Sequence, residues 1–170
     1  MAFFPNFNGF FMRIAVFYYS RTGNTLKIAG KIKEFFESKK ALVELYPLEP
    51  IKDTAPREML KQEKIEIKKV PYNLSDYDFV FVGTPIWGMK PTPVVLSFLK
   101  SLEKIDGKKF VLFFTCHVFT GSSVKKMSGI LAAKGAAAID SFAVKSLLPL
   151  DEKHLKKTAD FCEKIFAKLS

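Results

Sequence analysis

The sequence predicts a doubly wound α/β fold, in which a five-stranded parallel sheet lies between two layers of helices. Two observations lead to this prediction. Three short apolar runs, at residues 14–19, 79–82 and 110–114, are continuous rather than alternating, as strands are when both faces of a sheet are covered. Segments in which apolar residues recur at helical spacing lie between these runs. Strands and helices therefore alternate along the chain.

The remaining elements follow from weaker patterns. Residues 41–48 and 136–144 are less continuously apolar and are expected to form edge or near-edge strands. Thr92 and Pro93 suit the N-cap and the first position of a helix. The charged stretch 50–76 is expected to hold one short helix and connecting loop. Four longer helices are expected over residues 25–38, 93–102, 124–134 and 155–169.

Length and composition indicate one globular domain. The chain has 170 residues, enough for one sizeable core, and a composition of 48% hydrophobic and 26% charged residues excludes a disordered chain. With 27 Lys and Arg against 17 Asp and Glu, the formal net charge is +10. Such a balance favours anionic partners: an acidic redox protein, a phosphate-bearing cofactor, nucleic acid or an anionic membrane. The lysines are spread along the chain rather than gathered with aromatic residues, so nucleic-acid binding is not expected.

Residues 1–11, MAFFPNFNGFF, stand apart from the single domain expected over residues 12–170. They are too short to span a bilayer, which takes about 20 apolar residues, and they lack the basic region and cleavage site of a signal peptide. We expect either a loose apolar extension or a natural start at Met12, and a cytoplasmic protein. Cys116 and Cys162 match no metal-ligand spacing, so two buried, reduced thiols are expected, with one disulfide as the alternative.

The loop after the first expected strand favours binding of a phosphate. It runs directly into a helix, and its short polar side chains surround one glycine that allows a tight turn. Backbone N–H groups can then converge on an anion at the helix N-terminus. The glycine-rich patterns of diphosphate loops are missing here, so a phosphate monoester is expected, the alternative being an ordinary capped turn. The residues are Ser20, Arg21, Thr22, Gly23, Asn24 and Thr25.

These residues resemble the phosphate loop of flavodoxins, which bind flavin mononucleotide (FMN) and whose pattern S/T-x-T-G-x-T is fully matched here. Two further segments, GTPIWG at 83–88 and TCHVFTG at 115–121, occupy the places of the flavin-ring loops of that family. The resemblance covers residues 12–170. It implies a short-chain flavodoxin-like fold, strand order 2-1-3-4-5 and FMN as the cofactor. The ring contacts that it implies are Thr84, Pro85, Ile86, Trp87, Gly88, Thr115, Cys116, His117 and Gly121.

Among these residues, Trp87 is the most specific candidate for a contact with the flavin ring. An indole can stack on the flavin ring and shield it from water, whereas the alternative is a tryptophan in the core of the fold. Cys116 and His117 are neighbours on an extended segment and would point to opposite faces, so we expect no cooperating nucleophile and assign no catalytic residue. His117 could lie near the ring edge and stabilise negative charge on a reduced flavin.

Two functions remain open on the sequence alone. The first is an electron carrier in which FMN supplies the redox chemistry and which meets acidic protein partners. The second is an FMN-dependent NAD(P)H oxidoreductase that acts on quinones or similar acceptors. A carrier is expected to be a monomer and a reductase a dimer. A signalling receiver domain is disfavoured because Tyr19 and Ser20 stand where such a domain needs its phosphate-accepting aspartate.

Overall fold

Five parallel strands form the centre of the fold, in the spatial order β2-β1-β3-β5-β6. This computed structural model describes residues 12–169, so the expectation for residues 1–11 lies outside the described part. In chain order the parallel strands have the order 2-1-3-4-5, which confirms the prediction, and the two weaker runs do form the sheet edges. The strands are β1 (Arg13–Tyr18), β2 (Leu42–Pro47), β3 (Phe79–Trp87), β5 (Lys109–Cys116) and β6 (Ala137–Lys145).

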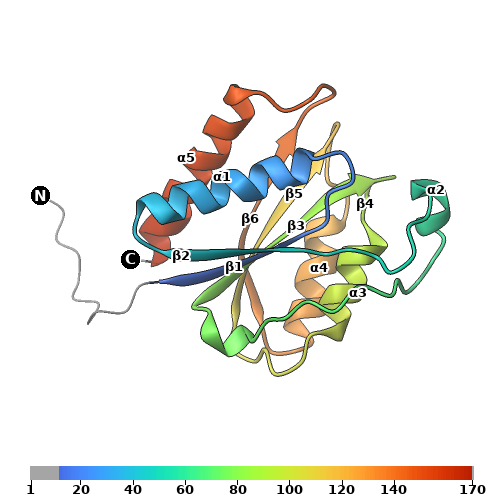
Figure 1. Ribbon diagram of the computed structural model, residues 1–170, viewed down its shortest axis with the longest axis horizontal. Coiled ribbons are helices and arrows are strands. Elements are labelled where there is room, and N and C mark those ends of the chain that lie inside the picture. Colours follow the sequence, from blue (N-terminus) through green and yellow to red (C-terminus); the bar gives the residue numbers. More distant parts are fainter. Residues whose placement is uncertain (1–11, 170) are drawn as a thin grey trace, which may run out of the picture.

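Helices cover both faces of this sheet and complete three layers (Figure 1). On one face, α1 and α5 pack against apolar side chains of β1 and β3, and on the other α3 and α4 enclose a second core. Four expected helices are thereby confirmed, with ends that differ by at most three residues. Their bounds are α1 (Asn24–Ser38), α3 (Pro93–Ser101), α4 (Ser123–Ala132) and α5 (Glu152–Leu169).

The third parallel strand is longer than the sequence indicated. β3 continues through Trp87 and folds back onto a two-residue strand, β4 (Lys90–Pro91), which pairs with it antiparallel. Gly88 and Met89 form the turn, and both have positive φ (55° and 62°), as a two-residue hairpin turn with the twist of its strands requires. The segment 83–88 is therefore a strand and hairpin rather than a loop, and the sheet has one short strand more than predicted.

Residues 50–76 contain the expected short helix, α2 (Pro56–Met59), and in addition a 3₁₀ turn, η1 (Leu74–Asp76). Three of their side chains, Met59, Ile65 and Leu74, are buried in the core beneath α3. The stretch looked like a charged loop because these apolar residues are spaced irregularly. It is held to the domain by the Ser97 hydroxyl, which accepts from the Ile65 backbone N–H at 2.8 Å.

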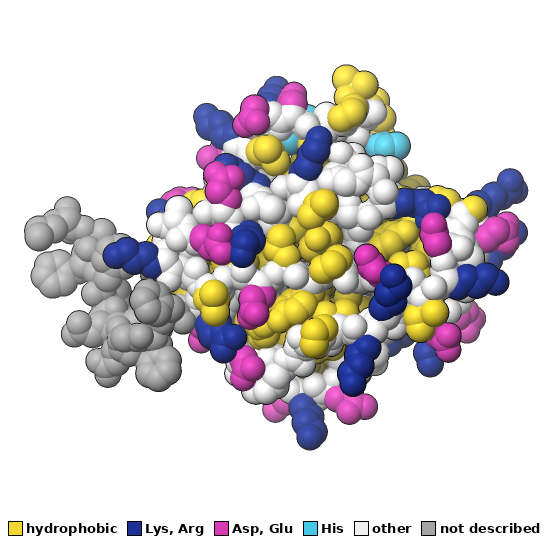
Figure 2. All heavy atoms as spheres, in the orientation of Figure 1, with side chains coloured by type: hydrophobic (Ala, Val, Ile, Leu, Met, Phe, Trp, Pro, Cys, Tyr) yellow, Lys and Arg dark blue, Asp and Glu magenta, His cyan; other side chains and the backbone are white. Residues whose placement is uncertain are grey.

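Charge is distributed in both signs over the surface that Figure 2 shows. Lysine and arginine side chains alternate with aspartate and glutamate around a group of hydrophobic side chains near the middle of this face (Figure 2). Several basic residues are in ion pairs, including Arg13 with Glu44 and Lys68 with Glu49. Within residues 12–169, no helix has the combination of length and apolar composition needed to cross a membrane.

Candidate functional site

The loop between β1 and α1 has the geometry of an anion-binding turn. Gly23 is the N-cap of α1 and lies in the left-handed region, with φ of 89°. The N–H groups of a first helical turn have no acceptor within the helix. The Ser20 hydroxyl accepts from one of them, that of Leu26, at 3.2 Å. Within the described chain nothing accepts from the N–H groups of Asn24 and Thr25, which remain available to a ligand.

A cavity of about 220 Å³ opens beside this loop, at the carboxyl ends of β1, β3 and β5. This is where strand order reverses, because β1 has β2 on one side and β3 on the other. The cavity thus joins the first loop to both segments that the sequence analysis singled out. Eight of the expected site residues line it: Thr22, Asn24, Pro85, Ile86, Trp87, Thr115, Cys116 and His117.

Trp87 reaches this cavity because β3 extends beyond the sheet. It is half-buried, and the ring of Tyr19 meets it edge to face, with centroids 5.7 Å apart and planes at 78°. Thr84 stabilises the base of the same extension, since its buried hydroxyl lies 3.0 Å from the Thr92 hydroxyl and accepts from the Thr92 N–H at 3.1 Å. Thr92 therefore occupies the expected N-cap position of α3. Its hydroxyl contacts Thr84 at the base of the hairpin and makes no capping hydrogen bond to the helix.

The tip of the hairpin contacts the loop after β5. A Cβ on Gly121 would lie 2.5 Å from the carbonyl oxygen of Met89, and Gly121 itself has φ of 57°. Only glycine fits this approach. Gly88 is exposed in the turn, and neither Gly88 nor Gly121 lines the cavity.

Cys116 and His117 both line the cavity but differ in exposure. Cys116 is buried, and this burial raises the pKa of its thiol, with the nearby Lys145 charge acting in the opposite direction. The thiol is therefore neutral near pH 7 and has little nucleophilic character. His117 is exposed at the rim. Cys162 lies in the other core, where burial raises its pKa to about 12, and both cysteines are free, as expected.

Ser20, Arg21 and Gly23 line a different hollow, on the β2 side of the same loop. That hollow is larger, at about 740 Å³, but it lies away from the junction of the three expected segments. The Arg21 guanidinium contacts the Asp53 carboxylate at 3.0 Å and the Thr54 carbonyl at 3.0 Å. Lys68, the other cation of this hollow, pairs with Glu49. Both cations are engaged there, so we place the functional site in the smaller cavity.

Three lining residues were missed by the sequence analysis: Val144, Ser146 and Leu150. They come from the end of β6 and from the connection to α5. A signal for the first of them was available, since strand order 2-1-3-4-5 sets the last strand beside β5, and Val144 is in register with Thr115. The other two belong to a connection whose path depends on how α5 begins, and no pattern in the sequence indicated it.

One buried hydroxyl pair joins the first loop to the third segment. Thr25 and Thr115 are both buried, and their Oγ1 atoms lie 2.9 Å apart. We expect Thr25→Val to lower the free energy of unfolding by about 1–3 kcal/mol, because it leaves the Thr115 hydroxyl buried without its partner. The double variant Thr25→Val/Thr115→Val should recover most of that loss. Urea unfolding of the three proteins tests this; a double variant that loses the sum of both single losses would contradict it.

The family model described as Flavodoxin matches residues 13–139. No curated protein matches. Among solved structures, oxidised flavodoxin 2 from Bacillus cereus is 22% identical, with a TM-score of 0.65 over 92% of this chain and 99% of its own. A flavoprotein of Lactobacillus acidophilus in complex with FMN is 19% identical, with a TM-score of 0.65 over 87% and 99%.

A flavodoxin from the domain Archaea is similar in the same way, at 18% identity and a TM-score of 0.64 over 92% of this chain and 98% of its own. At these identities the solved structures establish the fold. The family match is independent of them and spans most of the chain, from the first residue of β1 into β6. The chain belongs to the flavodoxin family.

Proposed function

We propose that this protein is an electron carrier that holds FMN in the cavity at the ends of β1, β3 and β5. The observation that carries the proposal is the convergence of two chemistries in one cavity. Thr22 and Asn24 bring a helix N-terminus to one side, and Trp87 brings an aromatic surface to the other. A phosphate needs the N–H donors of the helix N-terminus, and a flavin ring needs the aromatic surface. FMN, the cofactor that goes with the family, combines both.

The donor set suits the phosphate group. The Thr22 hydroxyl, the Asn24 amide and the N–H groups of the first turn of α1 are all donors, and the helix dipole favours a negative charge there. No aspartate or glutamate is among the described residues that line the cavity, so the phosphate would meet no like charge. We propose that the loop from Ser20 to Thr25 holds the phosphate, with Ser20 and Gly23 setting its shape.

The apolar part of the cavity suits the ring. Pro85, Ile86 and Trp87 form one wall, and Thr115 and Cys116 form another. When bound, the FMN ring accepts and releases electrons, while these residues position it and exclude water. The cavity measures about 220 Å³, smaller than the roughly 300–1,000 Å³ of sites that enclose a ligand. Part of the ring would remain exposed, which suits electron exchange with another protein.

The charge of the chain indicates the kind of partner. A net charge of +10 favours acidic redox proteins, since opposite charge raises the rate of encounter. NAD(P)H remains the alternative electron donor, and it is the one that would make the protein a reductase. A cytoplasmic location is part of the same proposal.

A visible spectrum during stepwise reduction tests the proposed function. The purified protein is reconstituted with FMN and reduced with dithionite and, separately, with NADPH. A carrier is expected to hold FMN, to take up the two electrons in separate one-electron steps, and to be unaffected by NADPH. Direct two-electron bleaching by NADPH would replace the carrier with the reductase. Failure of the protein to retain FMN would remove both functions.

A further inference from the structure

The connection between β6 and α5 forms a wall of the cavity that belongs to none of the three predicted segments. Ser146 and Leu150 line the cavity, whereas Leu147 and Leu148 between them are exposed. Few packing contacts therefore hold the middle of this connection in place. Its position depends on how its two ends are fixed.

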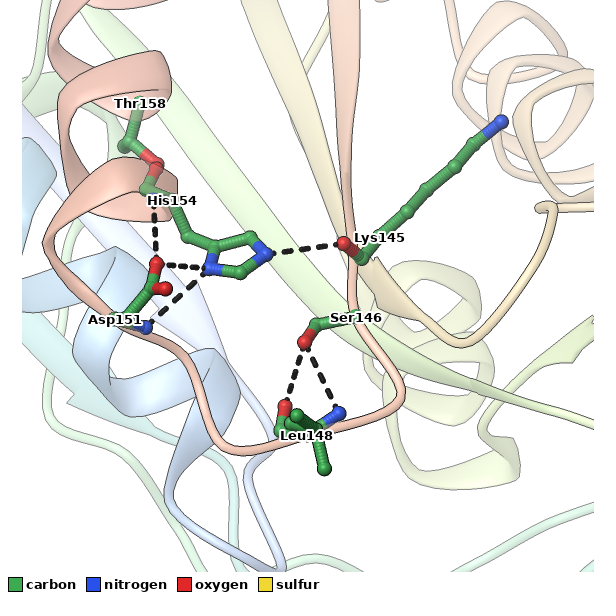
Figure 3. Close-up of polar contacts among 6 residues, drawn as sticks. All are labelled: Lys145, Ser146, Leu148, Asp151, His154 and Thr158. Atoms are coloured by element: carbon green, nitrogen blue, oxygen red, sulfur yellow. Dashed lines mark hydrogen bonds and ion pairs between the residues drawn. The ribbon is translucent and has the colours of Figure 1, made fainter.

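One imidazole ring connects those two ends. His154 lies on the first turn of α5, and its side chain is 17% exposed. Its Nε2 lies 3.2 Å from the carbonyl oxygen of Lys145, the last residue of β6, and its Nδ1 lies 2.5 Å from Oδ1 of Asp151, just before the helix (Figure 3). A carbonyl oxygen can only accept, so Nε2 must carry the proton in this contact.

The Asp151 side of the ring is fixed by the cap of α5. The His154 N–H donates to the Asp151 carboxylate at 3.2 Å, and the same carboxylate accepts from Nδ1 at 2.5 Å. Asp151 thereby acts as the N-cap residue of α5. The backbone and side-chain hydrogen bonds from His154 lower the pKa of the Asp151 carboxyl. The cap thus holds the ring in the orientation that reaches Lys145.

The contact with Lys145 continues into the cavity wall. Ser146 follows directly, and its N–H donates to the carbonyl oxygen of Cys116 at 2.9 Å. The Ser146 hydroxyl donates to the Leu148 carbonyl at 2.6 Å and accepts from the Leu148 N–H at 3.1 Å (Figure 3). A shift of the Lys145 carbonyl would therefore move a chain segment that touches both Cys116 and the cavity.

We propose that His154 is a positioning residue for the flavin site: its Nε2–H bond to the Lys145 carbonyl holds the wall from Ser146 to Leu150 in the place that FMN binding needs. This inference rests on the proposed function, because it requires FMN in this cavity. His154 does not line the cavity. It acts through the wall and has no contact with the cofactor.

Two substitutions separate the two contacts of the ring. An asparagine amide falls near the position of Nδ1, and a glutamine amide reaches the position of Nε2. His154→Asn should keep the bond to Asp151 and lose the bond to Lys145, whereas His154→Gln should do the reverse. We expect His154→Asn to raise the Kd for FMN by about 2- to 12-fold, the range set by one net hydrogen bond, and His154→Gln to stay within 2-fold of the unmodified protein.

Amide hydrogen exchange reports directly on how firmly the wall from Ser146 to Leu150 is held, which the Kd for FMN does not. Exchange at residues 146–150 should be faster in His154→Asn than in His154→Gln, with FMN and without it. In the unmodified protein, the nitrogen chemical shifts of His154 should show a protonated Nε2, a measurement that needs no variant to fold. Equal FMN affinity of the two variants, or an unprotonated Nε2, would overturn the inference while leaving the carrier intact. Loss of FMN from the unmodified protein itself would overturn the proposed function first.

Discussion

Replacing Trp87 with alanine is expected to weaken FMN binding by about 5- to 150-fold, because stacking of an aromatic side chain on a ring system is worth about 1–3 kcal/mol. Trp87 lines the cavity from the extended end of β3, and Tyr19 supports it edge to face at 5.7 Å. The indole is thus already held in place before a ligand binds. Fluorescence of FMN, which stacking quenches, gives the Kd in a direct titration.

A phenylalanine at the same position is the matched control. Trp87→Phe keeps an aromatic face against Tyr19 and should recover most of the affinity, whereas Trp87→Ala should not. Thermal unfolding without FMN shows whether either change disturbs the hairpin itself. If Trp87→Ala binds FMN within 2-fold of the unmodified protein, the ring does not lie on this wall, and the assignment of the cavity is wrong.

The fold could be predicted from the sequence because its strongest signals are local. Continuous apolar runs such as residues 79–82 and 110–114 have few alternatives to buried parallel strands, and both lie in the centre of the sheet. The beginning of α5 was placed three residues too late, at Leu155. The residue that starts this helix is Asp151, through its hydrogen bond to the His154 N–H, and an aspartate within a charged stretch gives no distinctive pattern.

The site was predictable where adjacent residues carry the signal. Gly23 and its polar neighbours indicated the first loop, and the structure gives it the expected tight turn and α1 start. The hairpin at Gly88 and Met89 could not be foreseen in the same way, because methionine rarely adopts the positive φ that both positions of this two-residue turn require. Met89 also lies close to Gly121, 32 positions away, a contact that no local pattern indicates. Likewise, the sequence alone places Thr84 in a loop, because its contact with the Thr92 hydroxyl is visible only in the structure.

Gly83 is another residue whose role depends on a contact distant in the sequence, and its substitution has the largest expected effect on stability. The sequence placed it at the start of a loop, but it lies within β3, in register with Phe113 of β5. A Cβ on Gly83 would lie 2.0, 2.2 and 2.6 Å from three atoms of the Phe113 ring. That ring is fully buried and stacks on Phe142 with centroids 6.0 Å apart. The glycine is thus required by the close approach of a neighbouring side chain.

We expect Gly83→Ala to lower the free energy of unfolding by about 3 kcal/mol, at the upper end of the cost of overpacking a core, because the buried ring has little room to move aside. Gly30→Ala is the matched control: it lies in α1 with no heavy atom within 4 Å of an added Cβ, so it should stabilise by about 0.5–1 kcal/mol. Urea unfolding measures both.

The double variant Gly83→Ala/Phe113→Leu tests the cause of the loss. A smaller side chain at position 113 should accept the added methyl group, so the double variant should lose less than the sum of the two single changes. Additive losses would mean that Gly83 is needed for its backbone and not for the ring above it. Since β3 leads directly from Gly83 to Trp87, a displaced Phe113 ring should also shift the cavity wall. Gly83→Ala is therefore expected to weaken FMN binding even at temperatures where the protein remains folded.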